Sequence, residues 1–360
     1  ISQPYMSITI EKKKRAYFPE DFKAEERAEL ERALRGMLSE EIGSPEELER
    51  FIEKCGELSY ILEEAGAWKM IRMTQHADDP EIAEAQAKFY EDIVAPSQPY
   101  FFKLDKKIFE SGYFKQLPRE RYGHLGKILQ NEIEMYREEN IPLFVEENRL
   151  VSRYGEIYSQ LTVRFEGEEK TLKEMDLVLK DKDRARRENA WRLISAKMLE
   201  KREVFEKLFD ELKALRIRIA HNAGFSNYRD YMHKAYGRFD YSPEDVLEFH
   251  DAIEAVVLPA LAERNEKRRR KLGIETLRPW DLSVDPDGKA LLPFTDAEDL
   301  LSGSVRILRR LDPDFADTLS AMAENDFLDL PNRKGKAPGG YSCALPETGA
   351  DFIFMNAVGI

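Results

Sequence analysis

Helix-forming patterns with clear start signals occupy most of this 360-residue chain, and they restrict its fold more than any other feature. Apolar residues recur three or four positions apart between runs of Glu, Lys and Arg, which is the pattern of amphipathic helices. In one example, Ser44 is a capping residue and Pro45 occupies the first helical position, where proline is favoured. Apolar Leu48, Phe51 and Cys55 follow on one face. The sequence therefore predicts a mainly α-helical protein.

The longest predicted helix begins after a capping Asp181 or Asp183 and ends at Gly224, a residue type that commonly terminates helices. About forty residues would make it roughly 60 Å long at about 1.5 Å per residue. A helix of that length extends beyond one small core, so we expect it to connect domains. Another helix is predicted from Asp79 to about Ile93, and Pro96 is expected to stop it because proline lacks a backbone N–H.

Strand signals are confined to two short parts of the chain. Residues 161–172 alternate around a Glu-Gly turn and predict a β-hairpin, and three further strand candidates lie within 327–355. We therefore expect a long-helix body of several lobes with a small β-sheet near its C-terminal end. Residues 1–115 are interpreted as a helical N-terminal domain, and 116–200 as a helical segment that carries the hairpin.

Composition excludes several classes of function. There are 56 Lys and Arg residues against 69 Asp and Glu, giving a net charge of −13, which argues against a nucleic-acid partner. No apolar run approaches the ~18–20 residues that a membrane span needs, so no membrane partner is expected. Two cysteines, Cys55 and Cys343, do not make a disulfide framework and favour a reducing, cytoplasmic location.

The histidines do not provide a metal site by their spacing. The chain has five, and no two of them lie four residues apart, so the His-Glu-x-x-His motif of zinc helices is absent: His76, His124, His221, His233 and His250. We therefore predict no catalytic residue and no metal ligand within this chain.

The segment Lys334–Tyr341 is the most informative candidate for binding. It contains Gly339 and Gly340 directly before Tyr341, and two interpretations remain open. The glycines could form a tight turn between strands, or they could let another backbone approach and pair as an added strand. On the second interpretation, Gly339, Gly340 and Tyr341 bind substrate. The chain then stops at Ile360 within apolar sequence, and from this we expect an unfinished sheet and a longer parent protein.

Several segments together resemble a known family. Residues 333–341, Leu345-Pro346 and 352–356 resemble the region just upstream of the zinc helix in oligoendopeptidase F, of the thimet oligopeptidase family of zinc metallopeptidases. Shorter matches precede them at 183–187, 223–228, 241–245 and 272–273, so the resemblance covers roughly residues 160–360.

The resemblance implies a zinc-dependent endopeptidase, zincin-like when complete, that hydrolyses short unfolded peptides. Zinc-activated water would attack the scissile carbonyl. Residues 201–360 would be the incomplete start of the catalytic domain, the zinc ligands would lie beyond Ile360, and the partners would be oligopeptides and the remainder of that domain. The alternative is a catalytically inactive helical protein that binds peptides or acts as a scaffold.

Overall fold

A computed structural model describes residues 10, 12–289, 291 and 293–358, and it confirms the mainly α-helical prediction. The first half of the chain is helical up to one hairpin: α1 (Arg27–Ser39), α2 (Pro45–Gln75), α3 (Pro80–Phe89), α4 (Ala95–Phe109), α5 (Arg119–Met135), α6 (Ile141–Ser159), β1 (Thr162–Phe165) and β2 (Glu168–Thr171). The second half ends in a small sheet: α7 (Leu172–Val178), α8 (Arg184–Glu200), α9 (Arg202–Asn222), α10 (Tyr228–Ala235), α11 (Pro243–Ala252), α12 (Leu258–Lys271), α13 (Ala297–Leu311), α14 (Pro313–Glu324), β3 (Leu328–Pro331), β4 (Tyr341–Leu345) and β5 (Ala350–Ala357).

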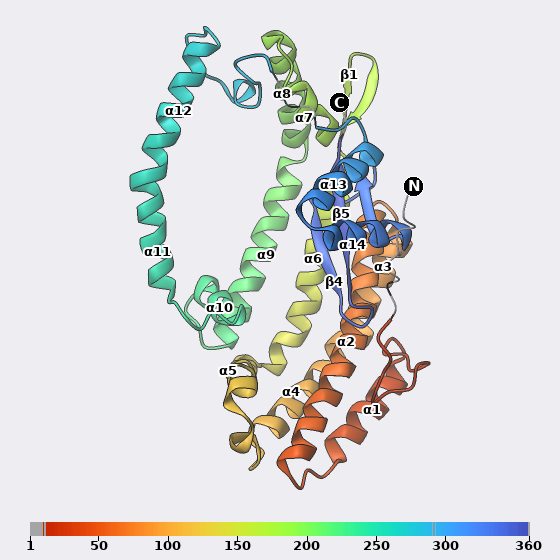
Figure 1. The fold of residues 1–360 in the computed structure, drawn as a ribbon. Coiled ribbons are helices and arrows are strands. Elements are labelled where there is room, and N and C mark those ends of the chain that lie inside the picture. Colours follow the sequence, from red (N-terminus) through yellow and green to blue (C-terminus); the bar gives the residue numbers. More distant parts are fainter. Residues whose placement is uncertain (1–9, 11, 290, 292, 359–360) are drawn as a thin grey trace, which may run out of the picture.

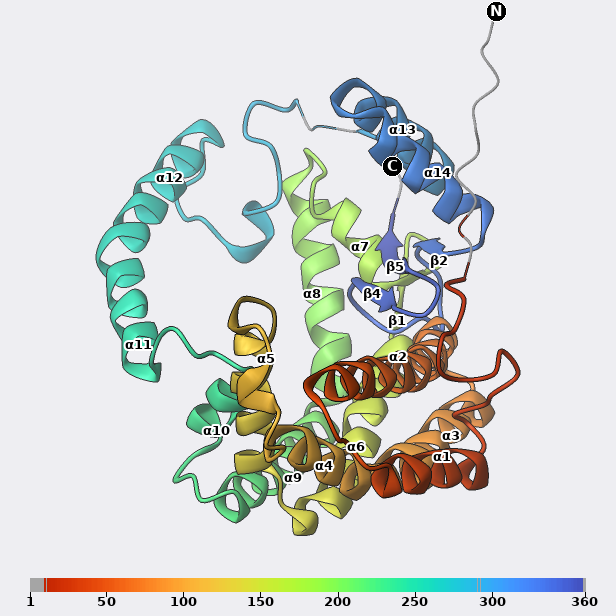
Figure 2. The same cartoon turned by 60° about the horizontal axis from the view of Figure 1, so that its bottom comes forward.

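The helices form a column with a detached arm (Figures 1 and 2). At its base, α4 packs against α1 and α5, and higher up α3 packs against α2. Above the base, α6 contacts α9, and the chain then continues through α10 into α11 and α12, which stand apart from the column. We call α11, the π-helical turn Ile253–Val257 and α12 the arch.

The predicted long helix is wrong in one respect. Its ends are correct, because the Asp183 side chain accepts the N–H groups of Ala185 and Arg186, and Gly224 adopts a φ of +86°. Lys201 leaves the helical conformation, however, and divides the segment into α8 and α9. The two pieces serve different cores: α8 packs around the hairpin, whereas α9 packs against α6 and α10. The break therefore allows the buried face to change direction.

The predicted stop at Pro96 is also wrong. A π-helical turn, Tyr90–Val94, joins α3 to α4, so the helical path passes both Pro96 and Pro99. Proline lacks the N–H of a regular helical ladder, and a local change in helical pitch is a known way to accommodate it.

Both β predictions are confirmed. β1 and β2 pair antiparallel with Thr162 opposite Thr171. The second sheet has the order β3-β5-β4, with β5 parallel to β3 and antiparallel to β4. Its buried face lies on α2, where Ile71 packs with Phe352, Phe354 and Leu345, each no more than 1% exposed. Among the described helices, none is long and apolar enough to cross a membrane.

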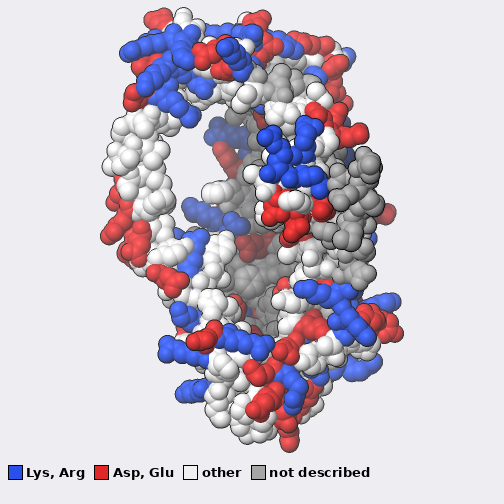
Figure 3. Space-filling view, in the orientation of Figure 1, with Lys and Arg blue, Asp and Glu red and all other residues white. Residues whose placement is uncertain are grey.

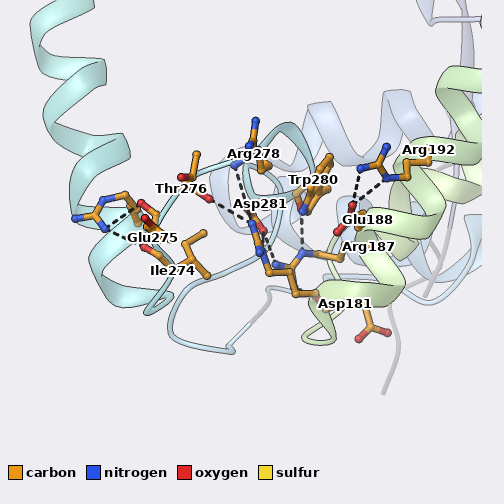
Figure 4. A network of polar contacts seen from close by, with 12 residues as sticks. Asp181, Arg187, Glu188, Arg192, Ile274, Glu275, Thr276, Arg278, Trp280 and Asp281 are labelled. Atoms are coloured by element: carbon orange, nitrogen blue, oxygen red, sulfur yellow. Dashed lines mark hydrogen bonds and ion pairs between the residues drawn. The ribbon is translucent and has the colours of Figure 1, made fainter.

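A buried ion pair fastens the far end of the arch to α8 (Figure 4). Asp281 is fully buried in the loop after α12 and accepts hydrogen bonds from Arg187 at 2.8 Å and from Arg184 at 2.9 and 3.0 Å. Arg187, only 2% exposed, also donates to the carbonyl oxygen of Trp280. Burial alone would raise the pKa of the Asp281 carboxyl, but the hydrogen bonds from Arg184, from the Arg278 amide and from Arg187 hold it below its ordinary value.

We predict that Asp281→Asn lowers the free energy of unfolding by about 3–5 kcal/mol, because it leaves the Arg187 guanidinium buried without its counter-charge. The matched control is Asp287→Asn in the same loop, where Asp287 pairs with Lys271 on the surface. That change should cost less than about 1 kcal/mol. Urea unfolding of both variants measures the difference, and equal losses would contradict the proposed clasp.

Candidate functional site

The loop between β3 and β4 is organised around a buried lysine. Lys336 has an exposed fraction of 3%, and its Nζ donates to the Asp329 carboxylate at 2.9 Å and to three carbonyl oxygens. These belong to Asp329 at 3.1 Å, Pro331 at 2.9 Å and Met355 at 2.7 Å. The ammonium also lies 4.4 Å from the centre of the Phe354 ring. Lys336 therefore ties β3, the loop and β5 together and is not available to a phosphate or another external anion.

Asp329 balances the charge of this lysine. Its carboxylate accepts hydrogen bonds from Lys336, from Arg333 at 2.8 and 2.9 Å, and from Gln75 at 3.0 Å. Burial alone would raise the pKa of Asp329, but these hydrogen bonds outweigh it and lower the pKa to about 2. Burial lowers the pKa of the Lys336 ammonium, and the hydrogen bond to Asp329 opposes that effect. The pair therefore carries opposite charges at neutral pH.

Backbone hydrogen bonds attach the same loop to the end of α2. The Ala77 N–H donates to the Gly335 oxygen at 2.7 Å, and the Ala337 N–H donates to the Thr74 oxygen at 2.8 Å, both at the end of α2. Gly335 has a φ of +85°, and a Cβ at this position would collide with the Asp78 carboxylate. Glycine is therefore required here by both conformation and space.

The structure gives local reasons for both predicted edge glycines. Gly339 has a φ of +91° with open space around it, so it serves the turn into β4. A Cβ at Gly340 would lie 3.1 Å from the Phe354 carbonyl oxygen and 3.7 Å from the Met355 Cα, so glycine allows β5 to approach closely. The two glycines thus serve the turn and the sheet itself, and whether they also contact substrate stays a prediction.

Tyr341, the third predicted residue, directs its ring into the sheet's core. The ring stacks on Phe354 with centroids 4.9 Å apart, and its hydroxyl lies 2.6 Å from the Thr74 hydroxyl. Burial raises the pKa of the phenol to about 12, so it stays protonated at neutral pH. Tyr341 therefore supports β4 from behind.

The outer edge of β4 has the geometry of a strand acceptor. On β5, the Ile353 N–H donates to the Phe327 oxygen on the β3 side, so by alternation the backbone groups of Phe352 and Phe354 face β4. The backbone groups of their partners on β4, Cys343 and Tyr341, therefore face β5. The intervening Ser342 and Ala344 direct their backbone N–H and C=O groups away from the sheet, toward its open edge. No strand in the described part of the chain pairs with this edge. Sequence reasoning missed Ser342 and Ala344, because only the strand order shows which residues face outward.

Metal ligands are not assembled by these residues. Within residues 10, 12–289, 291 and 293–358, no three His, Cys, Asp or Glu side chains are grouped so that they could hold a metal ion. The described residues therefore do not fit a zinc site. Ile360, beyond which the family resemblance implies the zinc ligands, lies outside the described residues.

Comparison with known proteins identifies the family. The family model for peptidase family M3 matches residues 177–359, which is about half of the chain. The chain belongs to peptidase family M3. No curated protein matches it significantly. The match includes β4 and the loop that Lys336 organises, so the candidate edge is part of the M3 sequence region.

Three solved structures share the fold of this M3 chain. An oligoendopeptidase F from Bacillus anthracis is 24% identical with a TM-score of 0.88, and covers 96% of this chain and 64% of its own. A second oligoendopeptidase F is 23% identical with a TM-score of 0.88 and coverages of 96% and 61%. Pz peptidase A, solved with an inhibitor, is 24% identical with a TM-score of 0.84 and the same coverages of 96% and 61%. The chain thus spans under two thirds of the length of these proteins.

We predict that Lys336→Met lowers the free energy of unfolding by about 3–5 kcal/mol, because it removes the buried one of the two counter-charges of Asp329 and leaves buried carbonyl oxygens without a donor. Lys334→Met is the matched control in the same loop, since Lys334 pairs with Glu169 at the surface. Its cost should stay below about 1 kcal/mol. Chemical unfolding monitored by circular dichroism compares the two, and a small loss for Lys336→Met would refute the role given to Lys336.

Proposed function

We propose that this chain is the N-terminal part of a zinc-dependent M3 endopeptidase that hydrolyses short, unfolded peptides. The observation that carries the proposal is the open edge of β4 within the M3 region. An extended peptide can pair with the outward groups of Ser342 and Ala344 as an added strand. In such pairing the affinity comes from main-chain hydrogen bonds and depends little on the peptide's side chains. This suits an enzyme that acts on peptides of varied sequence.

In this proposal the chain's own residues bind and orient the substrate. Lys336 and Asp329 fix the loop, Tyr341 and Phe354 fix β4 from behind, and the edge holds the peptide backbone in one register. A folded protein offers few free extended segments, so pairing of this kind selects unfolded peptides. Residues 1–115, 116–200 and 201–360 are kept as the proposed division into domains, with the last as the beginning of the catalytic one.

Zinc would supply a Lewis acid and an activated water when bound. Since the described residues do not fit a zinc site, we propose that its ligands come from outside this chain. The free thiols Cys55 and Cys343 are consistent with the proposed cytoplasmic location. Burial raises the pKa of the Cys55 thiol to about 12 and also raises that of Cys343, so neither is set up as a nucleophile.

We predict that the parent gene continues past the codon for Ile360 and encodes His-Glu-x-x-His within about fifteen residues. The i, i+4 spacing places both imidazoles on one helix face, where they can share a tetrahedral metal. Sequencing the gene tests this directly. A continuation without the motif would favour the inactive scaffold over the peptidase.

We predict that Ser342→Pro in the full-length enzyme lowers kcat/KM for peptides by about tenfold. The change removes the Ser342 N–H, and a tenfold loss corresponds to one backbone hydrogen bond between this group and the substrate. This N–H points outward, so proline is tolerated there by the sheet. The control Ser342→Ala keeps the N–H and should retain activity. Cys343→Pro should instead destabilise the protein, because that N–H faces β5. Peptide hydrolysis and melting temperature are measured together, and full activity in a folded Ser342→Pro enzyme would refute substrate pairing at β4.

A further inference from the structure

The arch is a long helical element without a core. None of the residues of α11, of the turn Ile253–Val257 or of α12 is buried. A helix in a globular protein normally buries an apolar stripe, and packing of that stripe supplies most of its stability. Among the described residues the arch has no such packing along its length, so its isolation requires an explanation.

The middle of the arch is apolar on more than one face. Between Ile253 and Leu261 the chain reads IEAVVLPAL, with a single charged residue, Glu254. Val256 is 69% exposed, Val257 50% and Leu258 51%. Side chains of consecutive helical residues point in different directions, so these three apolar side chains lie on more than one face of the arch. A helix that is apolar all round is a helix meant for burial.

Charge divides the rest of the arch into two zones. From Pro243 to Val257 there are five acidic residues and no Lys or Arg, whereas from Leu258 to Lys271 there are six Lys and Arg and two Glu. Figure 3 shows the acidic lower part, the uncharged middle and the basic upper part. A partner that covers the middle therefore meets opposite charges at the two ends, which fixes the direction in which it can lie.

The arch is held at both ends and open between them. Its lower end contacts α10, and its upper end returns to α8 through the clasp of Asp281 with Arg184 and Arg187. With all side chains drawn, an open window still separates the arch from the column (Figure 3). The exposed segment is therefore presented in a fixed position and does not collapse onto the column.

We propose that the arch is a docking surface for the part of this protein that lies outside the present chain. In the three solved structures with this fold, over a third of each chain lies outside the part that this chain matches. The docking segment should carry apolar residues opposite 253–261, basic residues opposite the lower end and acidic residues opposite the upper end. This inference rests on the packing of the arch and is independent of the proposed chemistry.

The test substitutes, in the full-length protein, two valines that are similarly exposed in the present chain. Val257 lies in the arch at 50% exposed, and Val151 lies on α6 at 47% exposed. If the arch is covered in the full-length protein, Val257→Glu buries a charge and should lower the melting temperature about three times as much as Val151→Glu, or more. Hydrogen exchange should show the amides of 253–261 as well protected as those of α9.

Two outcomes would overturn the proposal. Equal small effects of both substitutions, with fast exchange at 253–261, would mean that the arch remains bare. A full-length protein that is dimeric by light scattering, and that Val257→Glu converts to a monomer, would assign the surface to a second copy. Neither outcome depends on peptidase activity, so the substrate edge of β4 is tested separately.

Discussion

The candidate site depends on the hydrogen bonds and the ion pair that the buried ammonium of Lys336 makes. A charge of this kind is costly to bury unless hydrogen bonds and a counter-charge surround it. Here one side chain reaches β3, the loop and β5, while the loop backbone is bonded to α2. The sheet has three strands in the described part of the chain, and a sheet this small is stable only when its hydrophobic face is packed or a helix lies against it. The Lys336 network and the packing on α2 supply the rigidity that allows an exposed edge to keep one register.

Sequence pattern predicted what depends on local chemistry and missed what depends on contacts distant in sequence. The caps at Ser44 and Asp183 and the hairpin at 161–172 follow from short-range signals, and the structure contains all three. The break at Lys201 has no local signal, because it reflects two cores that α8 and α9 meet only after folding. The stop predicted at Pro96 fails because a π-helical turn accommodates the proline.

The same distinction explains the candidate site. The glycines stand out in the sequence, but their structural reasons, the turn at Gly339 and the β5 carbonyl beside Gly340, come from the sheet. Lys334 and Lys336 look equivalent in a basic loop, yet one is on the surface and the other has 3% of its area exposed. Which backbone groups face outward depends on the order β3-β5-β4, and order is a property of the assembled sheet.

The candidate substrate edge and the arch are two cases of incomplete packing. β4 leaves hydrogen-bonding groups open, and such groups are satisfied by water until another backbone replaces it, so the edge can bind reversibly. The arch leaves apolar side chains half-exposed or more, and complete burial of a fully exposed side chain of this size is worth about 1.5–3 kcal/mol. The cost of exposure applies continuously, because water does not satisfy apolar surface. An exposed edge is therefore compatible with a stable protein that has no ligand bound, whereas exposed apolar side chains such as those of 253–261 favour permanent coverage.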